Sequence, residues 1–208
     1  MASVITFAQQ KGGAGKTTLL TQLAVELSKG AGAALIDLDP QKTLSGWMDE
    51  RIRRTGEADL DLIESSEWRI GVDIGKAARD AELILIDCPG NADIMLNRVL
   101  RESDLVIIPA QPSAPDVWAT RATLRAAMRE GVDACVAFNR VPPRGGAVED
   151  MAQRLREDGA DLMEQRVGNR VAFSKAFAAG AAVSETERGS RAAEEIAALA
   201  AEIRRRLG

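Results

Sequence analysis

Histidine is absent from this chain of 208 residues, and cysteine occurs only twice. The lack of imidazole excludes histidine-based catalytic triads, most zinc sites and acid–base catalysis by histidine. Any catalysis must therefore use carboxylates, lysines, backbone groups and a hard metal cation.

The two cysteines, Cys88 and Cys135, each lie in or next to an apolar run typical of a buried strand. We expect two buried, reduced thiols of a cytosolic protein. The chain also lacks an apolar run of about 18 residues, the length needed to span a membrane, and no signal peptide can be recognised. These absences predict a cytoplasmic protein.

A strong charge of either sign is also missing, because the formal net charge is −4. No global field attracts the chain to nucleic acid, so any DNA-binding surface must be a local patch. Hydrophobic residues make up 46% of the chain and charged residues 28%, which is typical of a globular protein. We expect residues 1–208 to form a single domain.

Short apolar runs alternate along the chain with segments of helical periodicity. Strands are expected at residues 3–8, 33–37, 82–87, 104–109 and 132–138, with weaker candidates at 60–63 and 161–167. Helices are expected from residue 16, around 44–52, 70–77 and 95–100, at 116–130 and 148–158, and at the C-terminus. Residues 168–187 are expected to form a short helix and a loop. This alternation predicts an α/β fold with a doubly wound, mainly parallel sheet flanked by helices.

The first loop carries the pattern of a phosphate-binding loop. It follows the first strand and reads Gln10-Lys11-Gly12-Gly13-Ala14-Gly15-Lys16-Thr17-Thr18. Its glycines let backbone N–H groups surround an anion, and the following helix adds the positive end of its dipole. Lys16 supplies a positive charge for the phosphates, and Thr17 supplies a hydroxyl for Mg²⁺. The alternative is an ordinary glycine turn with two solvated lysines. Gln10 replaces the usual first glycine, and Lys11 is an additional lysine.

Carboxylates and an amide follow other predicted strands. In a parallel sheet the carboxyl ends meet at one edge, so Asp37, Asp39, Asp87 and Asn139 should converge on the first loop. Asp87 ends an aliphatic run, as in a Walker B segment, and is predicted to hold Mg²⁺ through water opposite Thr17. A helix cap or a surface carboxylate is the alternative for Asp87.

The loop resembles the deviant Walker A box of the ParA/MinD group of P-loop ATPases. Asp37-Leu38-Asp39-Pro40-Gln41 resembles the switch I segment of that group, and Asp87-Cys88-Pro89-Gly90 resembles switch II. The resemblance implies binding and slow hydrolysis of ATP to ADP with Mg²⁺ in a face-to-face homodimer. It also implies that Lys11 reaches the partner's phosphates, that Asp39 positions or deprotonates the attacking water, and that Asp37 supports the metal shell. Asp39 could instead only brace Lys16 or the metal waters.

The resemblance implies less specific roles farther along the chain. Asn139-Arg140 and the loop Gly168-Asn169-Arg170 resemble adenine-contacting positions, although a helix cap or a surface turn is equally compatible. ATP-dependent, nonspecific DNA binding is implied, and the candidates are Arg170, Lys175, Arg191, Arg204, Arg205 and Arg206. The arginine run could instead be a solvated helix end. A second cluster, Arg51, Arg53 and Arg54, is equally ambiguous.

The resemblance implies a ParA-like partition ATPase that is associated with the nucleoid when ATP is bound. A ParB-like adaptor protein would stimulate hydrolysis, and the cargo would be a plasmid, a chromosome or a protein assembly. Because the chain begins at the first strand, we expect no separate DNA-reading domain.

Three alternatives use the same scaffold: a MinD-like membrane ATPase, an ATP-dependent amide-forming synthase and an iron–sulfur reductase. The first needs a terminal helix with large apolar membrane anchors. The predicted terminal helix, with Ile196, Leu199, Ile203 and Leu207, lacks Phe and Trp, so we expect it to pack on the core and no membrane binding.

Overall fold

The computed structural model describes residues 2–90, 93–143 and 146–208. Seven parallel strands form one sheet in the order β3-β2-β4-β1-β5-β6-β7. The strands are β1 Ser3–Phe7, β2 Ala33–Asp37, β3 Asp61–Glu64, β4 Leu83–Asp87, β5 Leu105–Ala110, β6 Asp133–Phe138 and β7 Asp161–Leu162. The predicted doubly wound parallel sheet is confirmed.

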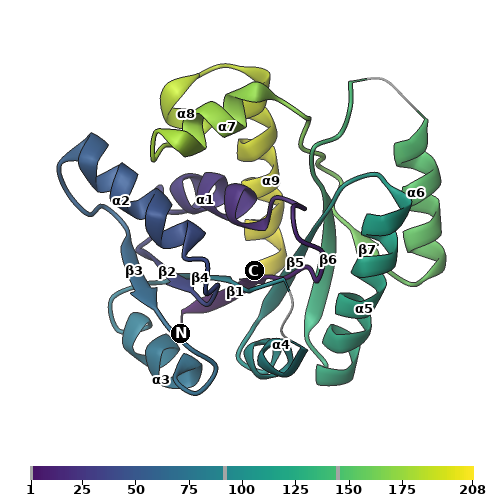
Figure 1. Cartoon of the computed structure of the whole chain (residues 1–208), viewed down its shortest axis with the longest axis horizontal. Coiled ribbons are helices and arrows are strands. Elements are labelled where there is room, and N and C mark those ends of the chain that lie inside the picture. Colours follow the sequence, from purple (N-terminus) through teal and green to yellow (C-terminus); the bar gives the residue numbers. More distant parts are fainter. Residues whose placement is uncertain (1, 91–92, 144–145) are drawn as a thin grey trace.

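Helices cover both faces of the sheet (Figure 1). On one face lie α1 Lys16–Leu27, α2 Thr43–Thr55, α7 Val171–Ala178, α8 Val183–Thr186 and α9 Arg191–Leu207. On the other face lie α3 Ile70–Ala77, α4 Asp93–Leu100, α5 Ala114–Glu130 and α6 Ala147–Glu157. The central strands are therefore shielded from water on both sides.

Strand β4 shows why its sequence is almost wholly aliphatic. Leu83 and Leu85 join the hydrophobic cluster beneath α1 and α9, whereas Ile84 and Ile86 join the cluster beneath α3 to α6. Successive side chains of a strand point to opposite faces, so a strand covered on both sides needs apolar residues at every position. All five residues of β4 are buried.

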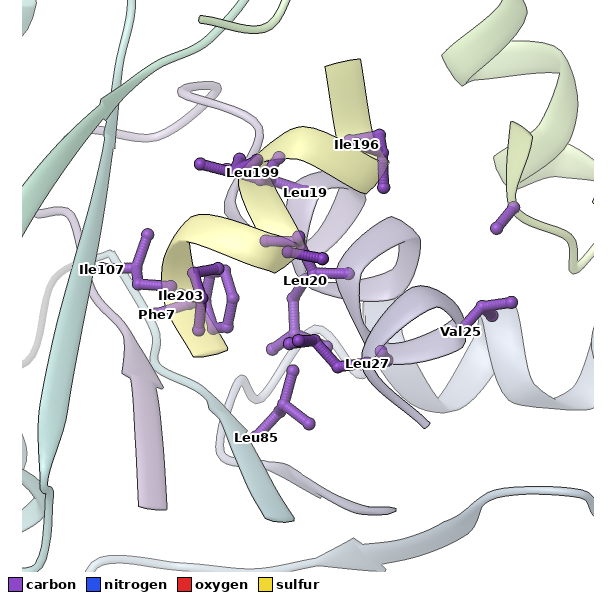
Figure 2. Packing of buried hydrophobic residues seen from close by; sticks show 14 of the residues in the cluster. Phe7, Leu19, Leu20, Val25, Leu27, Leu85, Ile107, Ile196, Leu199 and Ile203 are labelled. Carbon is purple, nitrogen blue, oxygen red and sulfur yellow. The ribbon is translucent and has the colours of Figure 1, made fainter. Parts of the chain in front are cut away.

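Helix α1 and the terminal helix α9 pack together on the centre of the sheet. Leu20 lies between the sheet residues Phe7 and Leu85 and the apolar side of α9 (Figure 2). Ile196, Leu199 and Ile203 of α9 are fully buried, and Leu207 packs against the same cluster. The expectation that the terminal helix packs on the core is confirmed.

Two predictions in the C-terminal part were inaccurate. The strand expected at residues 161–167 is limited to Asp161–Leu162, and residues 168–187 form two helices rather than one helix and a loop. Between α7 and α8, Gly180 has a φ of +60°, and a Cβ there would lie 2.1 Å from the backbone nitrogen of Arg51. Only glycine permits the backbone of α2 to approach this closely. The turn at Gly180 therefore divides the segment into the two helices α7 and α8.

Cys88 and Cys135 are buried free thiols, as expected. Burial raises the pKa of the Cys88 thiol far above its usual range and that of Cys135 to about 12, so both are inert at neutral pH. Within the described part of the chain, none of the helices combines the length and apolar character needed to cross a membrane.

Candidate nucleotide-binding site

The carboxyl ends of β1, β2, β4 and β6 bring the predicted site residues to one edge of the sheet. In the strand registers, Asp87 pairs with Phe7 on one side and with Asp37 on the other. A cavity of about 550 Å³ opens at this edge. The P-loop residues that line it are Gly12, Gly13, Gly15, Lys16, Thr17 and Thr18, and Asp39, Pro40, Gln41, Pro89, Gly90 and Arg140 also contribute.

The P-loop backbone takes a shape that depends on glycine. Gly13 and Gly15 have φ values of +82° and +85°, in the left-handed region. Gly15 is also the N-cap residue of α1, and a Cβ on it would lie 2.6 Å from Nδ2 of Asn139. The loop therefore presents its backbone and the positive end of α1 to the cavity.

Three side chains from distant loops hold the carbonyls of the P-loop. Asn139 donates to the Ala14 carbonyl at 3.1 Å, while Arg140 and Gln111 donate to the Gly13 carbonyl at 3.1 and 3.0 Å. Asn139 and Arg140 were predicted as adenine contacts, and here they brace the loop that would hold the phosphates. Gln111 was not predicted, because nothing near it in sequence links it to residue 13.

Thr17 and Asp87 form the pair predicted for magnesium. The Thr17 hydroxyl donates to Oδ2 of Asp87 at 2.6 Å, and Asp87 is fully buried. Its Oδ1 has no hydrogen-bond partner among the described residues. Burial raises the pKa of Asp87 to about 7, although the Thr17 hydrogen bond and the charge of Lys16 lower it.

An unsatisfied buried carboxylate oxygen beside a hydroxyl suits a hard cation, because Mg²⁺ prefers oxygen ligands and retains several waters. In the described residues, no cluster of three or more histidine, cysteine, aspartate or glutamate side chains could hold a metal by itself. The pair therefore fits a cation that is shared with phosphates rather than one held by a protein cage.

The two aspartates of the predicted switch I segment have different surroundings. Asp37 is buried; its Oδ1 accepts from the Asp39 N–H at 3.0 Å, and its Oδ2 accepts from the N–H and hydroxyl of Ser45 at 3.0 and 2.8 Å. Asp39 is half-buried and lines the cavity, and one of its oxygens accepts from the Gln41 N–H. Asp37 therefore braces the start of α2, whereas Asp39 faces the cavity.

Lys11 forms an ion pair within its own chain. Its Nζ lies 2.5 Å from Oδ2 of Asp116, whose side chain is fully buried at the start of α5. Asp116 also accepts from the Ser113 hydroxyl and the Gln111 N–H. The sequence did not reveal Asp116, which lies 105 residues from its partner.

A second, smaller cavity of about 280 Å³ lies beside the start of α1. It unites the two segments predicted to contact adenine, because Asn139, Arg140, Gly168, Asn169 and Arg170 all line it. Leu19 and Phe173 add apolar surface. An apolar cavity with a few polar groups is the kind of site that a nucleobase occupies.

Most of the predicted DNA-binding cations are engaged within the chain. Arg170 and Arg191 pair with Glu195 at 2.6 and 3.5 Å, and Arg206 pairs with Asp161 and Glu202. Arg204 donates to backbone carbonyls at the end of α1. Lys175 and Arg205 are exposed and form no ion pair with any described residue.

The second predicted cluster is not a free basic patch. The side chain of Arg51 is 3% exposed and pairs with Asp59 and Glu185 at 2.6 and 2.9 Å. Arg54 also pairs with Glu185, and Arg53 pairs with Glu50. Arg51 therefore links α2 to α8 and is unavailable to DNA.

The chain matches known proteins over most of its length. Residues 5–183 match the family model described as the CobQ/CobB/MinD/ParA nucleotide binding domain. The chain is 27% identical over 202 residues to the maintenance of carboxysome distribution protein A of Halothiobacillus neapolitanus, covering 94% of this chain and 93% of that protein. It is 32% identical over 187 residues to the protein ParA of Rhizobium radiobacter, covering 85% and 83%.

Solved structures show the same fold. A putative plasmid partition protein from Borrelia burgdorferi bound to AMPPNP superposes with a TM-score of 0.82 at 19% identity, covering 99% of both chains. The family match covers most of the chain and includes the P-loop, Asp37, Asp39, Asp87 and Asn139. The chain therefore belongs to the CobQ/CobB/MinD/ParA family of nucleotide-binding domains.

Proposed function

We propose that this protein is a partition or positioning ATPase that binds ATP and Mg²⁺, dimerises face to face and binds DNA without sequence preference. The observation that carries the proposal is the combination of Lys11 and Lys16 on one glycine loop with the Thr17–Asp87 pair at its end. A single P-loop lysine would support nucleotide binding alone. The second lysine supports a role for a neighbouring subunit.

The nucleotide would lie across the two cavities. Backbone N–H groups of residues 12–18 and Lys16 would bind the phosphates, and the cavity beside Leu19 and Phe173 would take the adenine. Thr17 and Asp87 would hold Mg²⁺, which would neutralise phosphate charge. The raised pKa of Asp87 accords with a carboxylate that gains its counter-charge only on loading.

Hydrolysis would be slow in an isolated subunit. Asp39 is the carboxylate that faces the cavity, so it would orient or deprotonate the attacking water. Lys11 would have to leave Asp116 before it could reach the phosphates of a second subunit. The positive charge of Lys11 at the partner's phosphates would stabilise the transition state and join the two subunits. ATP would therefore favour the dimer, and ADP would release it.

By analogy to proteins named for plasmid partition and for carboxysome distribution, the cargo would be a plasmid, a chromosome or a protein assembly. An adaptor protein on the cargo would stimulate hydrolysis and release the ATPase from DNA. Lys175 and Arg205 remain exposed for phosphate contacts, and dimerisation would double their number. The MinD-like alternative is less supported, because the terminal helix that would bind a membrane packs on the core.

Retention on random-sequence DNA with ATP, ADP and no nucleotide tests the proposal. We expect retention with ATP alone, and loss of retention in Lys11→Ala although that variant still binds ATP. Vesicles containing anionic lipid provide the comparison. Binding to vesicles with ATP and none to DNA would replace the proposal by the membrane alternative, and binding to neither would remove both.

A further inference from the structure

The carbonyl of Gly13, in the middle of the P-loop, accepts hydrogen bonds from two other loops. Nε2 of Gln111, in the loop after β5, donates at 3.0 Å, and Nη1 of Arg140, in the loop after β6, donates at 3.1 Å. The next carbonyl, that of Ala14, accepts from Nδ2 of Asn139 at 3.1 Å. We call Gln111, Asn139 and Arg140 the carbonyl clamp.

Holding a carbonyl also fixes the direction of the N–H group in the same peptide unit. A peptide unit is planar, and every peptide bond among the described residues is trans, so its C=O and N–H groups point in opposite directions. The carbonyl clamp therefore turns the N–H groups of Ala14 and Gly15 away from the loops after β5 and β6. The loops after β2 and β4 lie on the other side of β1 (Figure 1), where Asp39 and Pro89 line the larger cavity.

One of these N–H groups is buried without an acceptor. Ala14 is 1% exposed, and its N–H donates to no described residue. Buried backbone donors are nearly always paired, because an unpaired donor costs about as much free energy as a lost hydrogen bond. A buried, unpaired N–H that is aimed at the cavity side of a glycine loop suits an incoming anion.

Arg140 reaches the P-loop from a backbone conformation that few side chains adopt. Its φ is +53°, in the left-handed region. The Arg140 N–H donates to Oδ1 of Asn139 at 2.9 Å, which stabilises this turn. The turn places the guanidinium against the P-loop, since a Cβ on Gly15 would lie 3.6 Å from Nε of Arg140. The backbone at Arg140 thus gives the side chain its direction.

The Gln111 side chain can affect an anion only through Gly13. Among the described residues that line the two cavities, Gln111 is not included. Its amide side chain is neutral, and its backbone N–H donates to Oδ1 of Asp116 at 3.2 Å, which fixes the loop that carries it. Any effect of this side chain on phosphate binding must therefore act through the direction of the Gly13 carbonyl.

We infer that Gln111 and Arg140 are positioning residues that aim the N–H groups of the P-loop at the phosphates of a nucleotide. A carbonyl oxygen has two lone pairs and can accept from both donors at once, so one donor still directs it when the other is removed. Arg140 was predicted as an adenine contact, whereas this role concerns the phosphates. The inference rests on the proposed function only in taking the nucleotide to be ATP.

The test measures the affinity of the full chain for ATP, GTP and tripolyphosphate, each with Mg²⁺, by isothermal titration. Gln111→Met removes the donor and keeps the length of the side chain. Arg140→Asn removes the guanidinium, and asparagine tolerates the left-handed conformation. A double variant combines both changes. Gln153→Met and Arg125→Asn are the matched controls, because Gln153 is exposed on α6 and Arg125 is exposed on α5.

Each single variant should weaken ATP binding about threefold, which corresponds to one hydrogen bond. The double variant should weaken it at least about thirtyfold, more than the product of the single effects, because the carbonyl is released only when both donors are lost. GTP and tripolyphosphate should lose affinity by the same factors, since they share the phosphates and not the adenine. The controls should bind like the unchanged chain.

Three results overturn the inference. In the first, the double variant loses no more affinity than the product of the single variants. In the second, Arg140→Asn weakens ATP but not tripolyphosphate, which makes Arg140 an adenine contact. In the third, the Tm of the nucleotide-free variants falls in step with their affinity, which leaves Gln111 and Arg140 as residues that only stabilise the fold.

Retention on DNA at saturating ATP is measured with the same samples, which separates the two proposals. If Gln111 and Arg140 are coupled in phosphate binding while the unchanged chain is not retained on DNA, the carbonyl clamp stands and the proposed function falls. If the unchanged chain is retained with ATP and the two residues are not coupled, the carbonyl clamp falls alone.

Discussion

The lysines of the phosphate-binding loop, at the edge of the sheet that we call the nucleotide edge, and the arginines of the C-terminal part are held in different ways. Lys16 lines the larger cavity, and Lys11 has one ion-pair partner and a side chain that is 38% exposed. By contrast, Arg206 is held by two carboxylates, and Arg204 by carbonyls at the end of α1. A cation that is held by several groups of its own chain stabilises the fold, whereas one that lines a cavity, or that is partly exposed with a single partner, can bind an incoming anion.

Arg51 shows the same distinction within one predicted basic cluster. It is buried, it stacks 5.3 Å from the centroid of Trp47, and it donates to Asp59, Glu185 and the Gly180 carbonyl. Arg53, two residues later, has a side chain that is 68% exposed. Cation count along the sequence therefore does not separate structural arginines from functional ones, and mutation is the way to separate them.

Removal of Lys16 should have the largest effect. Lys16→Ala should weaken ATP binding at least about a hundredfold, because a charge-assisted contact to phosphate is lost in a partly enclosed site. Isothermal titration with ATP and Mg²⁺ measures the affinity. Lys29→Ala is the matched control, since Lys29 pairs with Glu26 on the surface. Equal affinities of the two variants would refute the assignment of the phosphate-binding loop.

Arg51 should be the most important cation for stability. Arg51→Ala should lower the free energy of unfolding by about 3 kcal/mol, because it leaves Glu185 and Asp59 without their buried partner. Arg53→Ala should change it by less than about 0.5 kcal/mol, since exposed ion pairs contribute little. Urea denaturation measures both. A similar loss in the two variants would mean that the burial of Arg51 has no energetic consequence.

Lys11 should matter for ATP-dependent dimerisation and not for ATP affinity. Lys11→Ala should keep ATP affinity within about threefold, since Lys16 and the backbone still bind the phosphates, but it should lose the ATP-dependent dimer. Sedimentation with ATP and with ADP measures the dimer, again with Lys29→Ala as control. An unchanged ATP dimer would contradict the cross-subunit role and leave Lys11 as a partner of Asp116 alone.

The nucleotide edge was largely predictable because its residues are adjacent in sequence or lie at strand ends. Strand ends in a parallel sheet meet at one edge, which placed Asp87 beside Thr17 although 70 residues separate them. Asp39 and Asn139 reached the same edge by the same rule. Apolar periodicity likewise predicted every strand of the sheet. The prediction for β7 was too long, because the N–H groups of Glu164 and Gln165 donate to the Glu202 carboxylate and not to β6.

The ion pairs could not be predicted. Arg51 and Glu185 are 134 residues apart, and Lys11 and Asp116 are 105 apart. Whether such groups meet depends on how helices on one layer are rotated and shifted, which apolar periodicity does not determine. The turn at Gly180 was missed for the same reason, because its requirement for glycine comes from the backbone of α2.

Asp39 should control turnover more than binding. Asp39→Ala should lower the rate of ATP hydrolysis at least about tenfold, because the cavity loses the carboxylate that we propose orients or deprotonates the attacking water. Phosphate release measures turnover, and gel filtration should show an accumulated ATP-bound dimer. Asp49→Ala, on the exposed side of α2, is the control. Normal turnover in Asp39→Ala would remove that residue from the reaction.

The smallest effects should come from the two adjacent arginines at the end of α9. Arg205 is exposed and has no ion pair among the described residues. The slope of the logarithm of the DNA association constant against the logarithm of salt concentration reports the number of phosphates contacted. Arg205→Ala should therefore lower the magnitude of this slope by an amount that corresponds to about one phosphate contact per subunit. Arg206→Ala should leave that slope unchanged, because its guanidinium is already paired with Asp161 and Glu202. Salt titrations of DNA binding with ATP distinguish the two. If Arg206→Ala lowers the slope and Arg205→Ala does not, pairing within the chain does not determine which cations bind DNA.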